Sequence, residues 1–232
     1  MDRSYSLTVT LCTALATAGQ GRLLFSHQTS VPPPVTRPAP DTAKPSYGEV
    51  MGVRSRWIAD LDAHPGDAPE IARSVLRWLV GAGVIVSERT DCVLGDVPGG
   101  YAPGPSCKTI VTGDPSGFPD VWPNGLEIDV GRSAFYGAVD EDDRVTCPRC
   151  GAWLPFEIVL TEVEEWLEGG PDSLVCARCG TRTGLNGWRW PVPCAFAELG
   201  LRFWNWPELT DAFVSDLGGR IGHRLVTGSF AT

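Results

Sequence analysis

The sequence predicts an α+β fold in which a mixed or antiparallel sheet packs against helices and carries an inserted four-cysteine zinc ribbon. The 232 residues include 20 prolines and 27 glycines, which indicates many turns between short elements. Segments that alternate apolar and polar residues, typical of strands, are interspersed with segments of helical period. Two Cys-x-x-Cys-Gly motifs lie close together, at residues 147–151 and 176–180. These features disfavour an all-helical protein and predict a metal site late in the chain.

The overall composition is that of a folded protein. Hydrophobic residues make up 43% of the chain and charged residues 20%, so global disorder is not expected. The net charge of −9 opposes a general attraction to nucleic acid or to anionic membranes. No apolar run reaches the roughly 18 residues that a membrane span needs.

The cysteines favour a cytoplasmic location. Four of the eight have an explanation as metal ligands, and this use of cysteine indicates a reducing compartment. Export is the alternative, because residues 7–16 are apolar enough for the core of a signal peptide. Against export, Arg3 is the lone positive charge before that core, and threonines interrupt it.

The chain divides into five predicted parts. Their boundaries follow the proline-rich stretch, the acidic run before the first cysteine pair and the tryptophans after the second pair. In order, the parts are an N-terminal strand and short helix of the α+β body (1–30), a Pro-rich loop or linker (31–46), the α+β body (47–139), the zinc-ribbon insertion (140–190) and a C-terminal β-α-β segment that completes the body (191–232).

The first 61 residues give strand, loop and helix signals in turn. Residues 5–12 alternate apolar and polar side chains, which predicts a strand. Residues 31–45 contain six prolines, and this excludes a helix or a central strand. Residues 47–61 predict a helix, because four apolar side chains fall on one helical face: Val53, Trp57, Ile58 and Leu61.

A helix and a hairpin are predicted next. Residues 67–81 carry an apolar stripe of helical period, and Asp67 and Pro69 suit the start of a helix. Strands at 84–86 and 108–112 then flank a turn-rich tip. This outline is also that of a winged helix, but the tip carries no lysine or arginine for DNA. A hairpin packed beside a helix is therefore the preferred interpretation.

The remaining elements follow from periodicity. Residues 126–130 alternate strictly and predict a half-exposed strand, and residues 159–167 predict a helix between the two cysteine pairs. Residues 199–203 predict a strand, 208–217 a helix and 223–228 a last strand. We expect this β-α-β ending to pair with the N-terminal strand.

The two cysteine motifs carry the clearest chemistry. Two residues between cysteines allow a tight turn to bring both sulfurs to one ion, and the glycine that follows accepts a positive φ. Soft sulfur ligands in a tetrahedral set favour Zn²⁺. Because four thiolates leave no open coordination position, we expect a structural site rather than a catalytic one. The predicted ligands are Cys147, Cys150, Cys176 and Cys179.

The surroundings of these cysteines weigh against nucleic acid and leave two interpretations of the tryptophans. Residues 140–180 contain ten acidic residues against three arginines, so the segment would repel a phosphate backbone. The tryptophans that follow either cover a ribbon too small to have its own core or form a protein-binding surface. The candidate partner-binding residues are Trp188, Trp190, Trp204 and Trp206.

No motif of an enzyme is present. The three histidines are far apart in sequence, and His223 after Gly222 is interpreted as a structural or surface residue. The chain lacks Gly-x-Ser-x-Gly, a phosphate-binding Gly-rich loop with lysine, and His-Glu-x-x-His. We therefore favour a non-enzyme, although a site assembled from scattered residues stays open.

Several motifs resemble those of an uncharacterised group of bacterial α+β proteins that carry a late four-cysteine zinc ribbon. They are the two Cys-x-x-Cys-Gly motifs, Phe203-Trp204-Asn205-Trp206-Pro207 and Gly222-His223-Arg224. The resemblance covers residues 76–232 and implies a fold pattern, with no activity to transfer.

The sequence thus favours a non-catalytic zinc-ribbon protein that binds a protein partner, as an adaptor, an assembly factor or an immunity-type inhibitor. An acidic protein suits a basic partner, and such pairs associate faster at low salt. The alternative is a nucleic-acid-binding or regulatory protein that uses the ribbon or the winged-helix-like segment.

Overall fold

The computed structural model describes residues 53–95, 99–113, 116–140 and 142–231 of the chain. The predicted strand at 5–12, the short helix after it and the Pro-rich loop or linker at 31–46 lie outside these residues.

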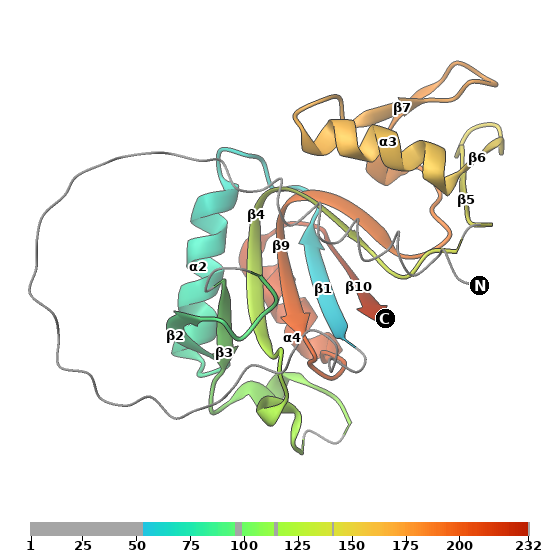
Figure 1. The fold of residues 1–232 in the computed structure, drawn as a ribbon. Helices are drawn as coiled ribbons and strands as arrows, with labels where there is room; N and C mark the ends of the chain where they lie inside the picture. Colours follow the sequence, from blue (N-terminus) through green and yellow to red (C-terminus); the bar gives the residue numbers. More distant parts are fainter. Residues whose placement is uncertain (1–52, 96–98, 114–115, 141, 232) are drawn as a thin grey trace, which may run out of the picture.

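The described residues form a mixed α+β fold around a six-stranded sheet (Figure 1). All of its paired strands are antiparallel, in the order β10-β1-β9-β4-β3-β2. The strands are β1 (Arg54–Asp60), β2 (Ile85–Thr90), β3 (Gly100–Pro103), β4 (Gly125–Tyr136), β9 (Cys194–Trp204) and β10 (Leu225–Ala231). The three α-helices of the described residues are α2 (Ala68–Gly81), α3 (Phe156–Leu167) and α4 (Asp211–Ile221).

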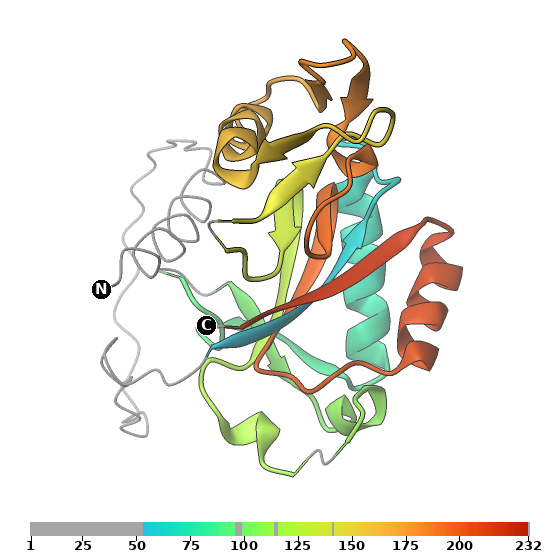
Figure 2. The same cartoon turned by 90° about the vertical axis from the view of Figure 1, so that its right-hand side faces the viewer.

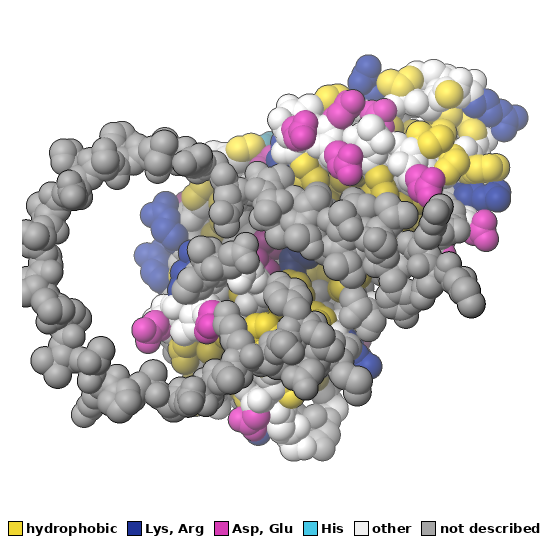
Figure 3. Space-filling view, viewed as in Figure 1, with side chains coloured by type: hydrophobic (Ala, Val, Ile, Leu, Met, Phe, Trp, Pro, Cys, Tyr) yellow, Lys and Arg dark blue, Asp and Glu magenta, His cyan; other side chains and the backbone are white. Residues whose placement is uncertain are grey.

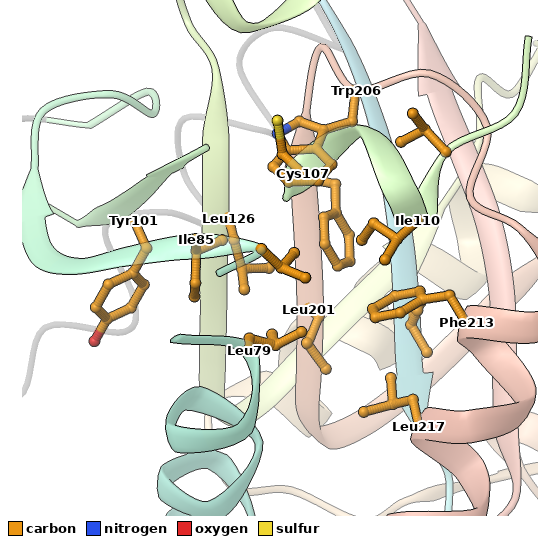
Figure 4. Close-up of a cluster of buried hydrophobic side chains, with 14 of the residues drawn as sticks. Leu79, Ile85, Tyr101, Cys107, Ile110, Leu126, Leu201, Trp206, Phe213 and Leu217 are labelled. Carbon is orange, nitrogen blue, oxygen red and sulfur yellow. The ribbon is translucent and has the colours of Figure 1, made fainter. Parts of the chain in front are cut away.

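The main core lies between the sheet and the helices α2 and α4. Residues of β1, β4 and β9 alternate in direction, and those on the helical side form one buried cluster with both helices. Figure 4 shows this cluster, in which side chains of the sheet meet those of the helices and of the Trp206 loop. Its fully buried members include Ile58, Leu79, Leu126, Leu201, Phe203 and Leu217.

The opposite face of the sheet buries aromatic rings against glycines. A Cβ at Gly200 would collide with the Phe135 ring, and a Cβ at Gly228 would collide with the Trp57 ring. Trp57 and Phe135 also pack against each other, with ring centroids 5.8 Å apart. The central strands are therefore buried on both faces, which explains why β9 is almost continuously apolar.

The predicted helix at 67–81 is confirmed as α2, and its apolar stripe faces the sheet. Ala72, Val75 and Leu79 are buried there. Asp67 occupies the N-cap position, but its carboxylate accepts a hydrogen bond from the His64 N–H, which precedes the helix, at 2.7 Å. The side chain thus stabilises the loop that enters the helix.

Two predicted elements are wrong. Residues 47–61 do not form a helix in their described part, because β1 occupies Arg54–Asp60 as a strand between β10 and β9. Burial on both faces of this strand produces consecutive apolar residues, whose spacing also fits a helix. The strand that returns after β2 is β3, whereas the predicted strand at 108–112 overlaps a 3₁₀ helix, Cys107–Ile110.

The C-terminal prediction is confirmed in type and order. A strand, a helix and a strand follow one another as β9, α4 and β10, although α4 begins three residues later than predicted, at Asp211. The partner of β10 is β1, with seven consecutive residue pairs in register. Pairing with residues 5–12 lies outside the described part of the chain.

Residues 137–193, hereafter the cysteine segment, connect β4 to β9 and lie beyond one end of the sheet (Figure 1). The two connected strands are direct neighbours in the sheet. The segment consists of two short hairpins with α3 between them, so the helix predicted at 159–167 is confirmed. The hairpin strands are β5 (Arg144–Thr146) with β6 (Trp153–Pro155) and β7 (Ser173–Val175) with β8 (Arg182–Gly184).

Membrane insertion by a helix finds no support among the described residues, where no helix combines the necessary length and apolar character.

Candidate metal centre

Each Cys-x-x-Cys-Gly motif forms the turn of one short hairpin. In the first, the Cys147 N–H donates to the Ala152 carbonyl at 2.7 Å, and the Gly151 N–H donates to the Cys147 carbonyl at 3.1 Å. Gly151 has φ of +70°, a conformation that glycine adopts without strain.

The second motif repeats this geometry. The Cys176 N–H donates to the Thr181 carbonyl at 2.9 Å, and the Gly180 N–H donates to the Cys176 carbonyl at 2.8 Å. Gly180 has φ of +68°. The glycine predicted from sequence as a requirement of the turn therefore serves the same purpose in both motifs.

The two turns bring the four sulfur atoms together. All four Sγ atoms, of Cys147, Cys150, Cys176 and Cys179, lie within 4.8 Å of one another. Two of the sulfur pairs join different turns, with Sγ–Sγ distances of 3.6 Å for Cys150–Cys176 and 3.9 Å for Cys147–Cys179. A tetrahedral ion with metal–sulfur distances of about 2.3 Å places its ligands about 3.8 Å apart. The cluster therefore has the dimensions of a four-thiolate metal site.

Local hydrogen bonds influence which thiols ionise. The Cys150 backbone N–H beside Cys147 lowers the pKa of that thiol, and the Thr181 hydroxyl and N–H lower the pKa of Cys179 to about 6. The Ala152 N–H acts in the same direction on Cys150, but desolvation and the neighbouring sulfurs raise its pKa to about 11. Four negative charges at this separation repel one another, so full ionisation of the cluster requires a bound cation.

The cysteines pack against a cluster of apolar side chains. Cys147 and Cys176 are buried, Cys150 is half-buried and Cys179 is exposed. The buried cysteines belong to a second hydrophobic cluster, which α3, the hairpins and the neighbouring ends of β4 and β9 form together. Its members include Val145, Val159, Val163, Trp166, Leu174, Leu185, Trp188 and Phe196.

The four candidate tryptophans do not lie on one surface. Trp188 and Trp190 belong to the cluster beneath the cysteines, where Trp188 is buried. Trp206 is buried in the main core, where its ring centroid lies 5.3 Å from that of Phe203. Trp204 is half-buried, and its Nε1–H donates to Glu127 Oε2 at 2.9 Å. The structural interpretation thus fits Trp188 and Trp206, and partner binding stays a prediction.

One exposed tryptophan was missed as a candidate. Trp153 in β6 is 51% exposed, and the Arg144 guanidinium lies over its ring, 3.9 Å from the centroid. No sequence pattern distinguishes Trp153 from a core residue, because it lies in a short stretch after the first cysteine pair with no periodicity to indicate exposure. Exposure distinguishes it from the other tryptophans.

His223 pairs with a buried carboxylate. Its Nδ1 lies 2.9 Å from Asp60 Oδ2, and Asp60 is 1% exposed. Hydrogen bonding to Asp60 raises the pKa of His223. The adjacent Arg224 donates to Asp62 and, through that hydrogen bond, lowers the pKa of Asp62 to about 2. These contacts tie the end of β1 to the start of β10, so His223 has a structural position.

No protein-family model, curated protein or solved structure matches this chain.

Proposed function

We propose that the four cysteines bind one Zn²⁺ and that the cysteine segment is a zinc ribbon inserted between β4 and β9. The observation that carries this proposal is the convergence of four sulfur atoms within 4.8 Å from two turns of the same geometry. Thiolate sulfur selects zinc over hard cations, and four such ligands saturate a tetrahedral ion. The metal is therefore structural and holds the two hairpins against α3.

We further propose that the chain is non-catalytic and that the cysteine segment binds a basic protein partner. The outward face of α3 supports this, because its glutamates are exposed and none forms an ion pair within the described residues. Figure 3 shows acidic side chains gathered over this helix. These glutamates are Glu157, Glu162, Glu164 and Glu165 of the helix and Glu168 at its C-cap.

The cysteine segment also exposes apolar side chains. Ile158 in the first turn of α3 is 57% exposed, and Trp153 and Val175 in the hairpins are about half exposed. Clustered charge accelerates association with an oppositely charged protein, while exposed aromatic and aliphatic groups supply burial once contact forms. Adaptors, assembly factors and immunity-type inhibitors all need such a surface.

Metal content tests the first part of the proposal. We expect the purified full-length chain to contain one zinc ion, measured by elemental analysis, and C147S/C176S to contain none. The matched control C92S changes a cysteine outside the cluster and should retain the ion. A wild-type chain without stoichiometric zinc after purification in the presence of zinc would refute the site.

Charge reversal tests the second part. A partner would be identified by crosslinking in the native cell, purified, and measured for its association rate with E164K/E165K. We expect a rate about tenfold lower than wild type at low salt, and a smaller difference at high salt. The control E88K/E208K makes the same change in net charge at exposed positions outside the cysteine segment and should have a smaller effect. Salt-sensitive binding of the wild type to a polyanion column would contradict this part and favour the nucleic-acid alternative.

A further inference from the structure

The first hairpin of the cysteine segment has an inner and an outer face. Residues directly opposite each other on antiparallel strands point to the same side of a sheet, and neighbours along a strand alternate. Val145 and Leu154 are partners in the β5–β6 ladder, and both pack in the hydrophobic cluster that includes the buried side of α3. The residues that alternate with them therefore point away from α3, toward solvent.

An aromatic ring and two arginines share this outer face. Thr146 pairs with Trp153 in the β5–β6 ladder. On its other side, Thr146 exchanges two backbone hydrogen bonds with Arg189, at 2.9 and 3.0 Å. The three residues thus form one row across the strands, and Arg144, two residues before Thr146, faces the same way. Arg144, Trp153 and Arg189 are hereafter the arginine–tryptophan face.

The side chains of this face are available for contact. Trp153 is 51% exposed, and both arginines are exposed. Neither arginine forms an ion pair with a residue in the described part of the chain. Asp143, which precedes Arg144, instead accepts a hydrogen bond from the Asp140 N–H at 2.8 Å. The Arg144 guanidinium lies 3.9 Å from the Trp153 ring centroid, and a stacked guanidinium keeps its N–H groups free to donate.

Basic and acidic side chains lie on opposite sides of the cysteine segment. The exposed glutamates of α3 face away from the hairpins, because the buried side of the helix packs against them. Figure 2 views α3 nearly end-on and shows the hairpins to one side of it. In Figure 3 the acidic side chains gather over α3, whereas arginine side chains lie at the margin of the segment. The segment is acidic as a whole, yet folding leaves it one locally basic face.

We infer that the arginine–tryptophan face binds a short acidic segment of a partner protein, one that also carries an apolar side chain. Guanidinium groups match carboxylates through paired N–H···O bonds, so two arginines near one ring hold two carboxylates. The exposed indole supplies apolar area, and tryptophan and arginine are enriched among the residues that dominate protein interfaces. This face is separate from the outward face of α3, so either proposal can fail without the other.

Charge decides between a short acidic segment and a long polyanion. At physiological ionic strength, charges more than about 8 Å apart are largely screened, so the two arginines govern a ligand confined to this face. A single-stranded nucleic acid has bases that stack on tryptophan, but its backbone would extend past the face, over a chain with a net charge of −9. A few carboxylates on a protein segment fit the face better.

An NMR titration of the purified, full-length chain tests this inference. The probe is the end-blocked peptide Glu-Gly-Phe-Gly-Glu, and the readout is the indole N–H signal of Trp153, assigned by its absence from W153F. We expect this signal to shift to saturation with the wild type. For R144A/R189A we expect the dissociation constant of the peptide to be about tenfold higher, because two charge-assisted contacts are lost. The control R73A/R77A removes two exposed arginines of α2 and should stay within about twofold of wild type.

A second peptide tests the role of charge without any variant. The neutral Gln-Gly-Phe-Gly-Gln should bind the wild type about tenfold more weakly than the acidic peptide, because it cannot form ion pairs. Thermal unfolding shows whether R144A/R189A remains folded. Four results overturn the inference: a Trp153 signal that does not shift, equal binding of the two peptides, a folded R144A/R189A that binds like wild type, or an oligodeoxythymidine strand that binds this face more tightly than the acidic peptide.

Discussion

The sheet with its two helices and the cysteine segment achieve order by different means. The sheet has strands of up to 12 residues, and its main core joins three central strands to α2 and α4. Each hairpin strand of the cysteine segment has three residues. Short ladders contribute few hydrogen bonds, and a segment of about 60 residues buries so little surface that its stability is marginal. Burial stabilises the sheet, whereas we expect the cysteine segment to depend on a bound metal ion.

The cysteine segment also depends on its neighbour. Its hydrophobic cluster includes Ala134 from β4 and Phe196 from β9, so part of its core belongs to the sheet. The reverse dependence is weaker, because the main core contains no residue of the cysteine segment. We therefore expect disruption of the segment to leave the sheet folded, and disruption of the sheet to affect both.

The largest effect is expected from removal of the metal. In C147S/C176S, backbone amides of the cysteine segment should lose their protection from hydrogen exchange, while those of β1, β4 and β9 keep it. Structural zinc contributes apparent binding free energies on the order of 10–16 kcal/mol in zinc-finger peptides. This exceeds the free energy of unfolding expected for a small segment without metal. C92S should match the wild type. Unchanged protection in the double serine variant would show that burial alone holds the segment.

A core truncation in the sheet should rank second. Phe203 is fully buried and contacts the rings of Trp206 and Phe213. F203A should lower the free energy of unfolding by about 3–5 kcal/mol, because it removes an aromatic ring and leaves a cavity. Chemical denaturation would measure this loss. The control F203L, closer in volume, should lose much less.

The same variant tests the independence of the two regions. We expect F203A to bind one zinc ion as long as the chain remains folded, because Phe203 lies outside the cluster beneath the cysteines. Loss of zinc from the folded variant would contradict the division between the regions.

Sequence reasoning succeeded where the signal is local. The apolar stripe of α2 and the alternation of residues 126–130 depend on neighbours within one element. The cysteine cluster is also local in this sense, because five consecutive residues encode each turn. Only the meeting of the two turns had to be assumed from the sequence, and the structure brings them together. Periodicity and spacing were sufficient for these features.

It failed where burial depends on the whole fold. β1 is buried on both faces, and this erased the alternation that would have distinguished a strand from a helix. Asp60 and His223 are separated by 163 residues in the sequence, so no local pattern could predict their contact. The tryptophans show the same limit, since Trp153 and Trp188 are equally apolar in sequence but differ in exposure, 51% against 4%.

The contact between the two regions gives the third prediction. Arg132 in β4 donates through Nη1 to the carbonyls of Trp166 and Gly170, the latter at 2.7 Å, and its guanidinium lies over the Trp166 ring. The Trp166 carbonyl lies in the last turn of α3 and Gly170 follows the helix, so the guanidinium lies at the helix C-terminus, where the helix dipole favours positive charge. R132A should therefore lower the stability of the cysteine segment by about 1–3 kcal/mol, detected by hydrogen exchange.

A second arginine provides the matched control. Arg220 also stacks on a tryptophan, Trp78, but it is exposed and joins no other region. R220A should leave exchange in the cysteine segment unchanged. Equal effects of R132A and R220A would assign the loss to a general change in charge rather than to the contact.

The smallest expected effect comes from the ionisation of one glutamate in the sheet. It tests whether the folded sheet disfavours a negative charge at that position. Glu127 lies on the face of the sheet opposite the helices, where burial and, secondarily, Asp129 raise its pKa to about 7. The folded state therefore favours the protonated form. Stability from this group is fully present below its unfolded pKa, near 4.5, and is lost as pH rises through about 7.

E127Q should remove this pH dependence and still accept the hydrogen bond from Trp204 Nε1. Between pH 6 and pH 8.5, urea unfolding of the wild type should lose on the order of 1 kcal/mol relative to E127Q. The difference between the two proteins matters, because His223 has a raised pKa and loses stabilisation in the same direction in both. Parallel pH profiles would mean that Glu127 ionises without a loss of stability, because Arg202, its cross-strand neighbour, compensates for its partial burial.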